Sequence, residues 1–96
     1  MKAKLKNFLD AQGKLTAFPT KRKMKIVALF YLAEKFEAGK TYREVDINSI
    51  LLDWHTFADP ATLRRELYDY HFLDRSADGR SYQLSPAQPK PEDFDL

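Results

Sequence analysis

The dipeptide Asp59-Pro60 constrains the fold of this chain more than any other feature, because it shows where one helix must begin. An aspartate caps the free N–H groups of a helix, and a proline in the first helical position needs no N–H partner. Leu63 and Leu67 then follow at helical spacing on one face. These signals predict a helix over about 60–70.

A second helix is predicted just before this one. The apolar residues at positions i, i+3, i+4 and i+7 of that segment are Ile47, Ile50, Leu51 and Trp54. This spacing favours a helix over about 44–54, joined to the next by about four residues. Two short helices with so tight a connection resemble a helix-turn-helix.

A longer helix is predicted earlier, over about 20–37, with Thr20 as a candidate cap and Gly39 as its stop. Its apolar stripe consists of Ile26, Leu29, Phe30, Ala33 and Phe36. A shorter amphipathic turn precedes it and ends at Gly13. The body of the chain is therefore mainly helical.

The last regular element is predicted to be a β-hairpin. Asp78-Gly79 supplies the positive φ angles of a tight turn, and segments 72–75 and 81–84 form its arms. Segment 40–43 is long enough for a single extended rung. We therefore expect an α+β fold of the winged helix-turn-helix kind, with three main helices and a C-terminal β-hairpin wing.

We expect one domain over residues 1–85, including the short N-terminal helix, and a flexible acidic tail over 86–96. The chain has no cysteine, so no disulfide or Cys-ligated zinc is expected. No apolar run is long enough for a membrane span, and the N-terminal residues are too polar for a signal peptide. These features predict a cytoplasmic protein with no membrane partner.

Several motifs together resemble a known family. They are Lys14-Leu15, Pro19-Thr20-Lys21-Arg22-Lys23, Ile26 to Phe36, Tyr42 to Leu51 with Asn48, Thr62-Leu63-Arg64-Arg65-Glu66-Leu67, and Asp78-Gly79 with Tyr82. Over about residues 8–84 the chain is similar to the bacterial family catalogued as domain of unknown function 2087. One departure is Arg43, where that family tends to carry a small hydroxyl residue able to cap the second helix. The resemblance implies a transcription-regulator module, sometimes attached to other DNA-binding or acetyltransferase domains, with no established activity or cofactor.

Basic side chains gather near the N-terminal end. Residues 1–25 carry eight Lys or Arg against one Asp, a net charge of +7, whereas residues 26–96 carry a net charge of −5. Such asymmetry indicates a polyanion or an acidic partner for this end of the molecule. Exposed Lys and Arg also serve solubility, and that interpretation stays open beside the first.

Four cations lie in the first turns of the helix predicted over 20–37: Lys21, Arg22, Lys23 and Lys25. The helix dipole already places partial positive charge there, so a sequence selected for stability alone would carry Asp or Glu. Free N–H groups and four cations together form an anion site, and DNA phosphate is a candidate ligand. The alternative is a solvated basic surface.

The remaining candidate DNA contacts are Thr62, Arg64, Arg65, Tyr68, Arg75 and Arg80. Arg65 could reach a guanine edge, and Thr62 or Tyr68 a phosphate, if this helix enters a major groove. Arg64 could instead pair with a helix carboxylate and fix the packing. Arg75 and Arg80 flank the hairpin turn and could follow phosphates or a minor groove. Residues 43–74 carry a net charge of −4, which opposes the approach of this helix to a duplex.

Two functions from different classes follow. The first is a DNA-binding transcriptional regulator that contacts phosphates of double-stranded DNA through the basic helix start and the wing. The alternative is a winged-helix module for protein–protein interaction or dimerisation, without DNA binding, whose partner is another protein or a second copy. His55 and His71 lack the spacing of a metal site, and neither a phosphate-binding glycine loop nor a nucleophile motif is present. We therefore expect no metal, no cofactor and no enzymatic activity.

Overall fold

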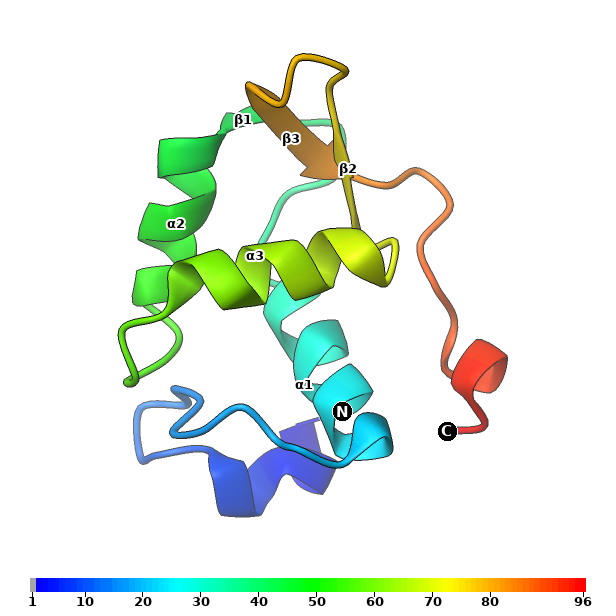
Figure 1. Cartoon of the computed structure of the whole chain (residues 1–96). Helices are drawn as coiled ribbons and strands as arrows, with labels where there is room; N and C mark the ends of the chain where they lie inside the picture. The colour runs from blue at the N-terminus through cyan, green and yellow to red at the C-terminus, as the bar shows by residue number, and fades with distance from the viewer. Residues whose placement is uncertain (1) are drawn as a thin grey trace.

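The computed structural model describes residues 2–96 and has the predicted α+β architecture (Figure 1). Its elements in chain order are η1 (Lys2–Phe8), α1 (Arg22–Ala33), β1 (Tyr42–Arg43), α2 (Glu44–Leu52), α3 (Pro60–Asp69), β2 (Leu73–Arg75), β3 (Ser81–Leu84) and η2 (Pro91–Phe94), where η denotes a 3-10 helix. The strands form one antiparallel sheet in the order β1-β3-β2. Helix α3 crosses in front of α1 below this sheet in Figure 1. Among residues 2–96, no helix has the length and apolar character needed to cross a membrane.

The three predicted α-helices are present, with small differences at their ends. Helices α2 and α3 begin at their predicted first residues and end within two residues of their predicted ends. Helix α1 is shorter than predicted, because Lys21 rather than Thr20 occupies its N-cap position. At its other end the N–H groups of Lys35 and Phe36 donate to carbonyls only three residues earlier, which tightens the chain after Ala33. The prediction that Thr20 caps this helix is therefore wrong.

Helix α2 begins after Arg43, a residue that has no hydroxyl to cap it. The backbone N–H and the guanidinium of Arg43 both donate to the carboxylate of Asp46, at distances of 2.9 to 3.0 Å. These hydrogen bonds hold the pKa of Asp46 below its usual value of 3.8. An acidic residue inside the first turn therefore stabilises this helix start.

The connection between α2 and α3 is held by His55, which is 4% exposed. The backbone N–H of Asp59 donates to Nε2 at 2.9 Å, so the ring hydrogen lies on Nδ1 and is donated to the carbonyl of Leu51 at 2.6 Å. Asp59 in turn accepts a hydrogen bond of 3.2 Å from the backbone N–H of Thr62, inside the first turn of α3. The end of one helix and the start of the next are thus joined through one ring.

The loop before α1 pairs with this connection. The N–H of Leu15 donates to the carbonyl of Trp54 at 2.8 Å, and the Leu15 carbonyl accepts from the N–H of Thr56 at 3.0 Å. The ammonium of Lys35 lies 3.9 Å from the ring centroid of Trp54 and 4.2 Å from that of Tyr31. The N-terminal loop, α1 and the α2–α3 connection therefore support one another.

The predicted hairpin is confirmed between β2 and β3, and its register pairs Arg75 with Tyr82. Gly79 in the turn has a φ of +74°, a conformation that glycine adopts without the strain of a Cβ atom. Strand β1 joins the hairpin through the pairing of Tyr42 with Tyr82, as expected for a single rung. The sheet therefore lies beside α2 and α3 and carries the hairpin turn beyond them.

The core fills the space between the helices and the sheet. Leu63 and Leu67 of α3 are completely buried, as their spacing predicts. Other fully buried side chains are Leu5, Leu15, Ile26, Leu29, Leu32, Ile47, Leu51 and Phe72. The ring of Phe72 meets that of Phe30 edge-on, with 4.8 Å between the centroids. Helix α3 is thus fixed on its inner side and free on its outer side.

Residues 86–96 lie beside α1 and the end of α3. Phe94 packs edge-on against Phe30 and Tyr70, with ring centroids 6.1 and 6.3 Å apart. The side-chain amide of Gln88 donates to the carbonyl of Phe72 at 2.8 Å. The flexibility of this segment stays a prediction, and these contacts define where it docks.

Truncation of the buried stripe of α3 should destabilise the protein strongly. Leu63→Ala or Leu67→Ala removes a side chain with 0% exposure, and we expect each to lower the free energy of unfolding by about 2 to 5 kcal/mol. Arg65→Ala on the exposed face of the same helix is the control and should cost less than about 0.5 kcal/mol. Urea titrations followed by circular dichroism measure all three values. A large loss for Arg65→Ala would assign this arginine to the packing.

Candidate nucleic-acid interface

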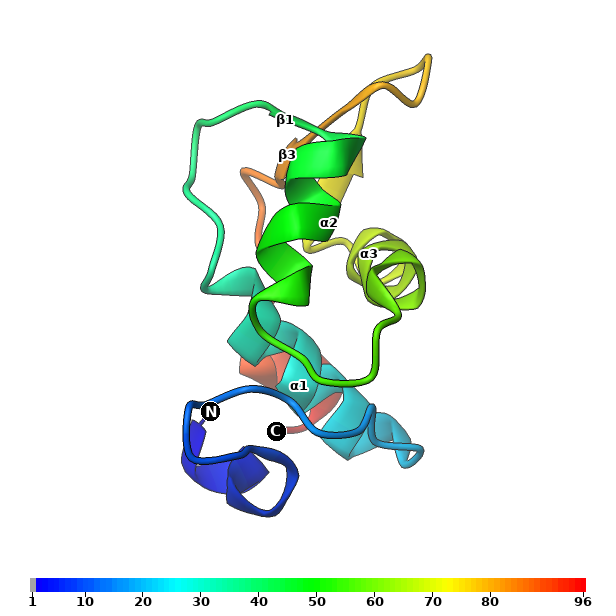
Figure 2. The same ribbon diagram turned by 90° about the vertical axis from the view of Figure 1, so that its left-hand side faces the viewer.

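Three parts of the molecule that carry predicted contacts lie along one side. In Figure 2 the start of α1, the helix α3 and the turn between β2 and β3 follow the right-hand edge from bottom to top. The same parts lie toward the viewer in Figure 1. The 3-10 helix η1 lies at the lower left of Figure 2, away from α3. The fold therefore brings together on one side residues that are far apart in the sequence.

Lys21, Arg22 and Lys23, which we call the basic start of α1, are all exposed. The first turn of α1 contains no acidic residue, and its N-cap makes no side-chain hydrogen bond. The helix dipole adds partial positive charge to the three cations, so this end attracts anions. The guanidinium carbon of Arg22 also lies 5.9 Å from the ring centroid of Tyr70 and 5.8 Å from that of Phe94.

Two of the predicted contacts, Lys25 and Arg64, are tied to neighbouring helices. Lys25 Nζ lies 3.4 Å from Glu66 Oε1, with the two side chains 26% and 22% exposed. Arg64 donates to Oδ1 of Asn48, and its Nη2 lies 3.5 Å from Glu44 Oε1. These contacts link α1 to α3 and α2 to α3. For Arg64 they match the alternative interpretation, in which it pairs with a helix carboxylate and fixes the packing.

The outer face of α3 presents two of the predicted contacts to solvent. Arg65 is exposed and forms no ion pair with any of the residues 2–96, and Tyr68 is 37% exposed. Thr62 is half-buried in the first turn, where its backbone N–H donates to Asp59. Of the four predicted residues on this helix, Arg65 and Tyr68 are therefore the most accessible.

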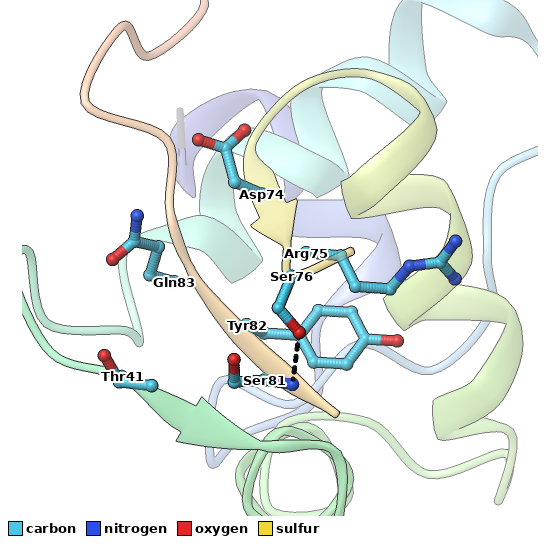
Figure 3. Close-up of a pocket in the computed structure, with 7 residues that line it drawn as sticks. All are labelled: Thr41, Asp74, Arg75, Ser76, Ser81, Tyr82 and Gln83. Atoms are coloured by element: carbon cyan, nitrogen blue, oxygen red, sulfur yellow. Dashed lines mark hydrogen bonds between the residues drawn. The ribbon is translucent and has the colours of Figure 1, made fainter. Parts of the chain in front are cut away.

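The hairpin places Arg75 against α3. The Arg75 guanidinium carbon lies 4.7 Å from the ring centroid of Tyr68. Figure 3 shows Arg75 extending toward the helix, while Asp74 and Gln83 point to the other side of the strands. Arg80 is exposed beside the hairpin turn. The structure thus connects one predicted wing residue to the outer face of α3 and leaves the other in solvent.

A polar hollow lies beside the hairpin. It is lined by Thr41, Asp74, Arg75, Ser76, Ser81, Tyr82 and Gln83 (Figure 3). The hydroxyl of Ser76 accepts from the N–H of Ser81 at 3.1 Å and donates to Asp78 at 2.6 Å. That hydroxyl and the N–H of Arg80 lower the pKa of Asp78. These polar groups satisfy one another and stabilise the turn.

The acidic residues of segment 43–74 are less available than their number suggests. The carboxylates of Glu44, Asp46 and Glu66 each lie within 3.5 Å of a basic nitrogen. The carboxylate of Asp59 caps α3 instead. The net charge of −4 already counts Arg43 and Arg64, so only the pairing of Glu66 with Lys25, which lies outside the segment, reduces it. Asp53 and Asp69 remain exposed.

The two histidines occupy different environments. His55 is buried with both ring nitrogens used, whereas His71 is exposed and has a φ of +69° just after α3. Within residues 2–96, no group of three His, Cys, Asp or Glu side chains is placed to hold a metal ion.

Sequence reasoning missed the aromatic residues that surround two of the cations. Tyr70 and Phe94 flank Arg22, and Tyr68 lies under Arg75. Each pair joins different elements, and Phe94 lies in a segment with no periodicity. No local spacing in the sequence indicates these contacts.

The comparisons with known proteins identify a family but supply no activity. A family model described as "Uncharacterized protein conserved in bacteria (DUF2087)" matches residues 14–84. No curated protein and no solved structure matches the chain. The match covers α1 to β3, and therefore includes every candidate contact described above.

The contacts of Arg64 should make it a stabilising residue. Arg64→Ala should lower the free energy of unfolding by about 1 to 2 kcal/mol, because the charged hydrogen bond to Asn48 is lost. Loss of the ion pair with Glu44 adds little, since that carboxylate is half exposed. Arg65→Ala, one position along the helix, is the matched control. A double-mutant cycle with Asn48→Ala in urea titrations measures the coupling. If Arg64→Ala is as neutral as Arg65→Ala, Arg64 belongs among the free surface cations.

Asp59 should make stability depend on pH in the acid range. Hydrogen bonding from Thr62 lowers the pKa of Asp59 below its usual 3.8. Its contribution is therefore fully present above that unfolded-state value and is lost as the pH falls through the lower folded-state pKa. Asp59→Asn keeps an oxygen that can cap and should weaken this acid dependence, whereas Asp59→Ala should also lower stability near neutral pH. Thermal unfolding midpoints across the acid range test both, and an Asn variant as acid-sensitive as the wild type would contradict the assignment.

Proposed function

We propose that this chain, which belongs to the bacterial family DUF2087, is a DNA-binding transcriptional regulator module of the winged helix-turn-helix kind. Helices α2 and α3 are then the helix-turn-helix, and the β2–β3 hairpin is the wing. The phosphates of a duplex are contacted by the basic start of α1 and by Arg75 and Arg80 of the wing. Such contacts supply affinity that does not depend on base sequence.

The observation that carries this proposal is the placement of exposed cations on one side. The basic start of α1, the outer face of α3 and the hairpin turn share the right-hand edge of Figure 2. That edge crosses α3, which Figure 2 shows nearly end-on, so a duplex lying along the edge would meet cations on either side of the helix. The α1 cations also have no acidic residue beside them in the first turn.

The acidic residues of α2 and α3 oppose this arrangement. Lys25 of α1 pairs with Glu66 of α3 and offsets one charge of the net −4 of segment 43–74, whereas the pair of Glu44 with Arg64 is already counted in that value. In the proposed complex Arg64 and Lys25 act mainly by holding α3 in position. Arg65 and Tyr68 are then the side chains free to enter a groove.

The alternative function, a protein interaction or dimerisation module, is favoured by a different surface. Val45 and Leu52 of α2 are 59% and 49% exposed, and their spacing of seven residues places them on the same side of the helix. Exposed apolar residues aligned in this way suit contact with another protein. Sedimentation of the wild type and of Val45→Lys separates this function from DNA binding, because α2 lies outside the basic edge.

Removal of two cations from the basic start should weaken DNA binding and reduce its salt dependence. For Lys21→Gln combined with Lys23→Gln, we expect the slope of log affinity against log salt to fall by about 0.9 for each lost phosphate contact, or by nearly 2. The reason is that fewer counterions are released on binding. Fluorescence anisotropy with a mixed-sequence duplex at several salt concentrations measures the slope.

The matched control is Lys4→Gln combined with Lys6→Gln. Both lysines are exposed on η1, which lies away from α3, so the net charge changes equally at a different place. The control should retain the wild-type slope apart from a small general effect of net charge. Equal slopes in the two double variants would remove the basic start from the interface. The DNA proposal would be defeated if neither the wild type nor the C-terminal variants described below bind a duplex at about 50 mM salt, where phosphate contacts are strongest.

A further inference from the structure

We infer that the C-terminal segment 86–96 is an internal ligand of the basic start of α1, and that it shields these cations from polyanions until it is displaced. This inference deepens the proposed function and rests on it in naming DNA as the polyanion. The segment would then set the affinity of the module for its ligand. The inference rests on the contacts of Phe94, on the charged residues next to it, and on the partial burial of the segment.

The aromatic ring of Phe94 anchors the segment at a residue of the basic start. The guanidinium carbon of Arg22 lies 5.8 Å from the Phe94 centroid and 5.9 Å from the Tyr70 centroid, so it contacts both rings. Phe94 also meets Phe30 of α1 edge-on at 6.1 Å. A cation that would face a phosphate is thereby held against a ring of the same chain.

Three carboxylates flank this anchor: Glu92, Asp93 and Asp95. All three are exposed. Asp93 accepts a hydrogen bond of 2.9 Å from the backbone N–H of Lys90, which closes the short helix η2 and fixes the direction of the acidic group. All three lie within two residues of Phe94, which contacts Arg22, so the docked segment brings negative charge toward the side of α1 that carries Arg22. The helix dipole favours negative charge near this end of α1.

The attachment is weak enough to be reversed. Phe94 and Leu96 are half-buried, and in residues 2–96 none of the three carboxylates forms an ion pair with α1. Their attraction acts across water and is screened by salt. Gln88 adds two hydrogen bonds of 2.8 Å, to the carbonyls of Phe72 and Ser85. The segment contributes no fully buried residue to the core, and Leu96 packs against the core as a half-buried side chain.

Competition of this kind must act in both directions. If the docked segment lowers the affinity for a polyanion, the bound polyanion lowers the affinity for the segment by the same factor. The inference therefore predicts that the segment becomes mobile when a polyanion binds, as well as that polyanions bind better when the segment cannot dock. The two effects are measured independently.

The experiment uses the full chain and two variants that act differently. Phe94→Ala removes the anchor and keeps the charges, whereas Glu92→Gln with Asp93→Asn and Asp95→Asn keeps the anchor and removes the charges. Ala87→Ser, which changes neither, is the control. Affinities are measured for heparin, a polyanion that requires no DNA-specific contact, and for mixed-sequence duplex DNA. Heteronuclear NOE values of residues 91–95 report docking directly.

Both variants should bind heparin at least about fivefold more tightly than the wild type, the lower end of typical coupling between two sites. Phe94→Ala should also lower the NOE values of residues 91–95, and heparin should lower them in the wild type. Unchanged heparin affinity in both variants would overturn the shielding, even where DNA is bound. A rise in heparin affinity without DNA binding by any variant would uphold the shielding and defeat DNA as the ligand.

Discussion

A single buried imidazole positions the helix on which the proposed surface depends. One ring nitrogen of His55 accepts a hydrogen bond from the N–H of Asp59, the N-cap residue of α3, and the other donates to the carbonyl of Leu51 near the end of α2. A neutral ring alone offers a donor and an acceptor on opposite edges. Ala58, inside this connection, has a φ of +52°, which residues with a Cβ atom normally avoid. The position of α3, and with it that of Arg65 and Tyr68, therefore depends on a buried ring in the connection that precedes the helix.

The fold uses some basic residues of this chain in internal ion pairs and leaves others in solvent. Arg43, Lys25 and Arg64 face carboxylates of the same chain and secure the helices, whereas Lys21, Lys23 and Arg65 remain in solvent. Net charge does not separate these groups, because it counts each cation equally. What a ligand would meet depends on which side chains the fold has already used.

The order of the main helices and strands, and the first residues of α2, α3 and β3, were predictable because the signals are local. The aspartate and proline before α3, the spacing of Leu63 and Leu67, and the Asp78-Gly79 turn act within a few residues of themselves. The candidate site was less predictable. The sequence indicated which cations it contains, but not which are tied to α3, and it gave no sign of the ring of Phe94 beside Arg22. Those contacts join segments far apart in the chain, so they depend on the completed packing.

Because Lys35 contacts Trp54, the intrinsic tryptophan fluorescence of the protein reports on this part of the structure. Trp54 is the single tryptophan of the chain, and the ammonium lies 3.9 Å from its ring centroid. A fixed charge so close to an indole shifts the energies of its excited states, so the emission of this ring depends on the distance to that ammonium. Because the backbone of Trp54 also bonds to Leu15, any loosening of the N-terminal loop changes the surroundings of the indole. The fluorescence of Trp54 therefore reports, without an added label, on the contacts between the N-terminal loop, α1 and the α2–α3 connection.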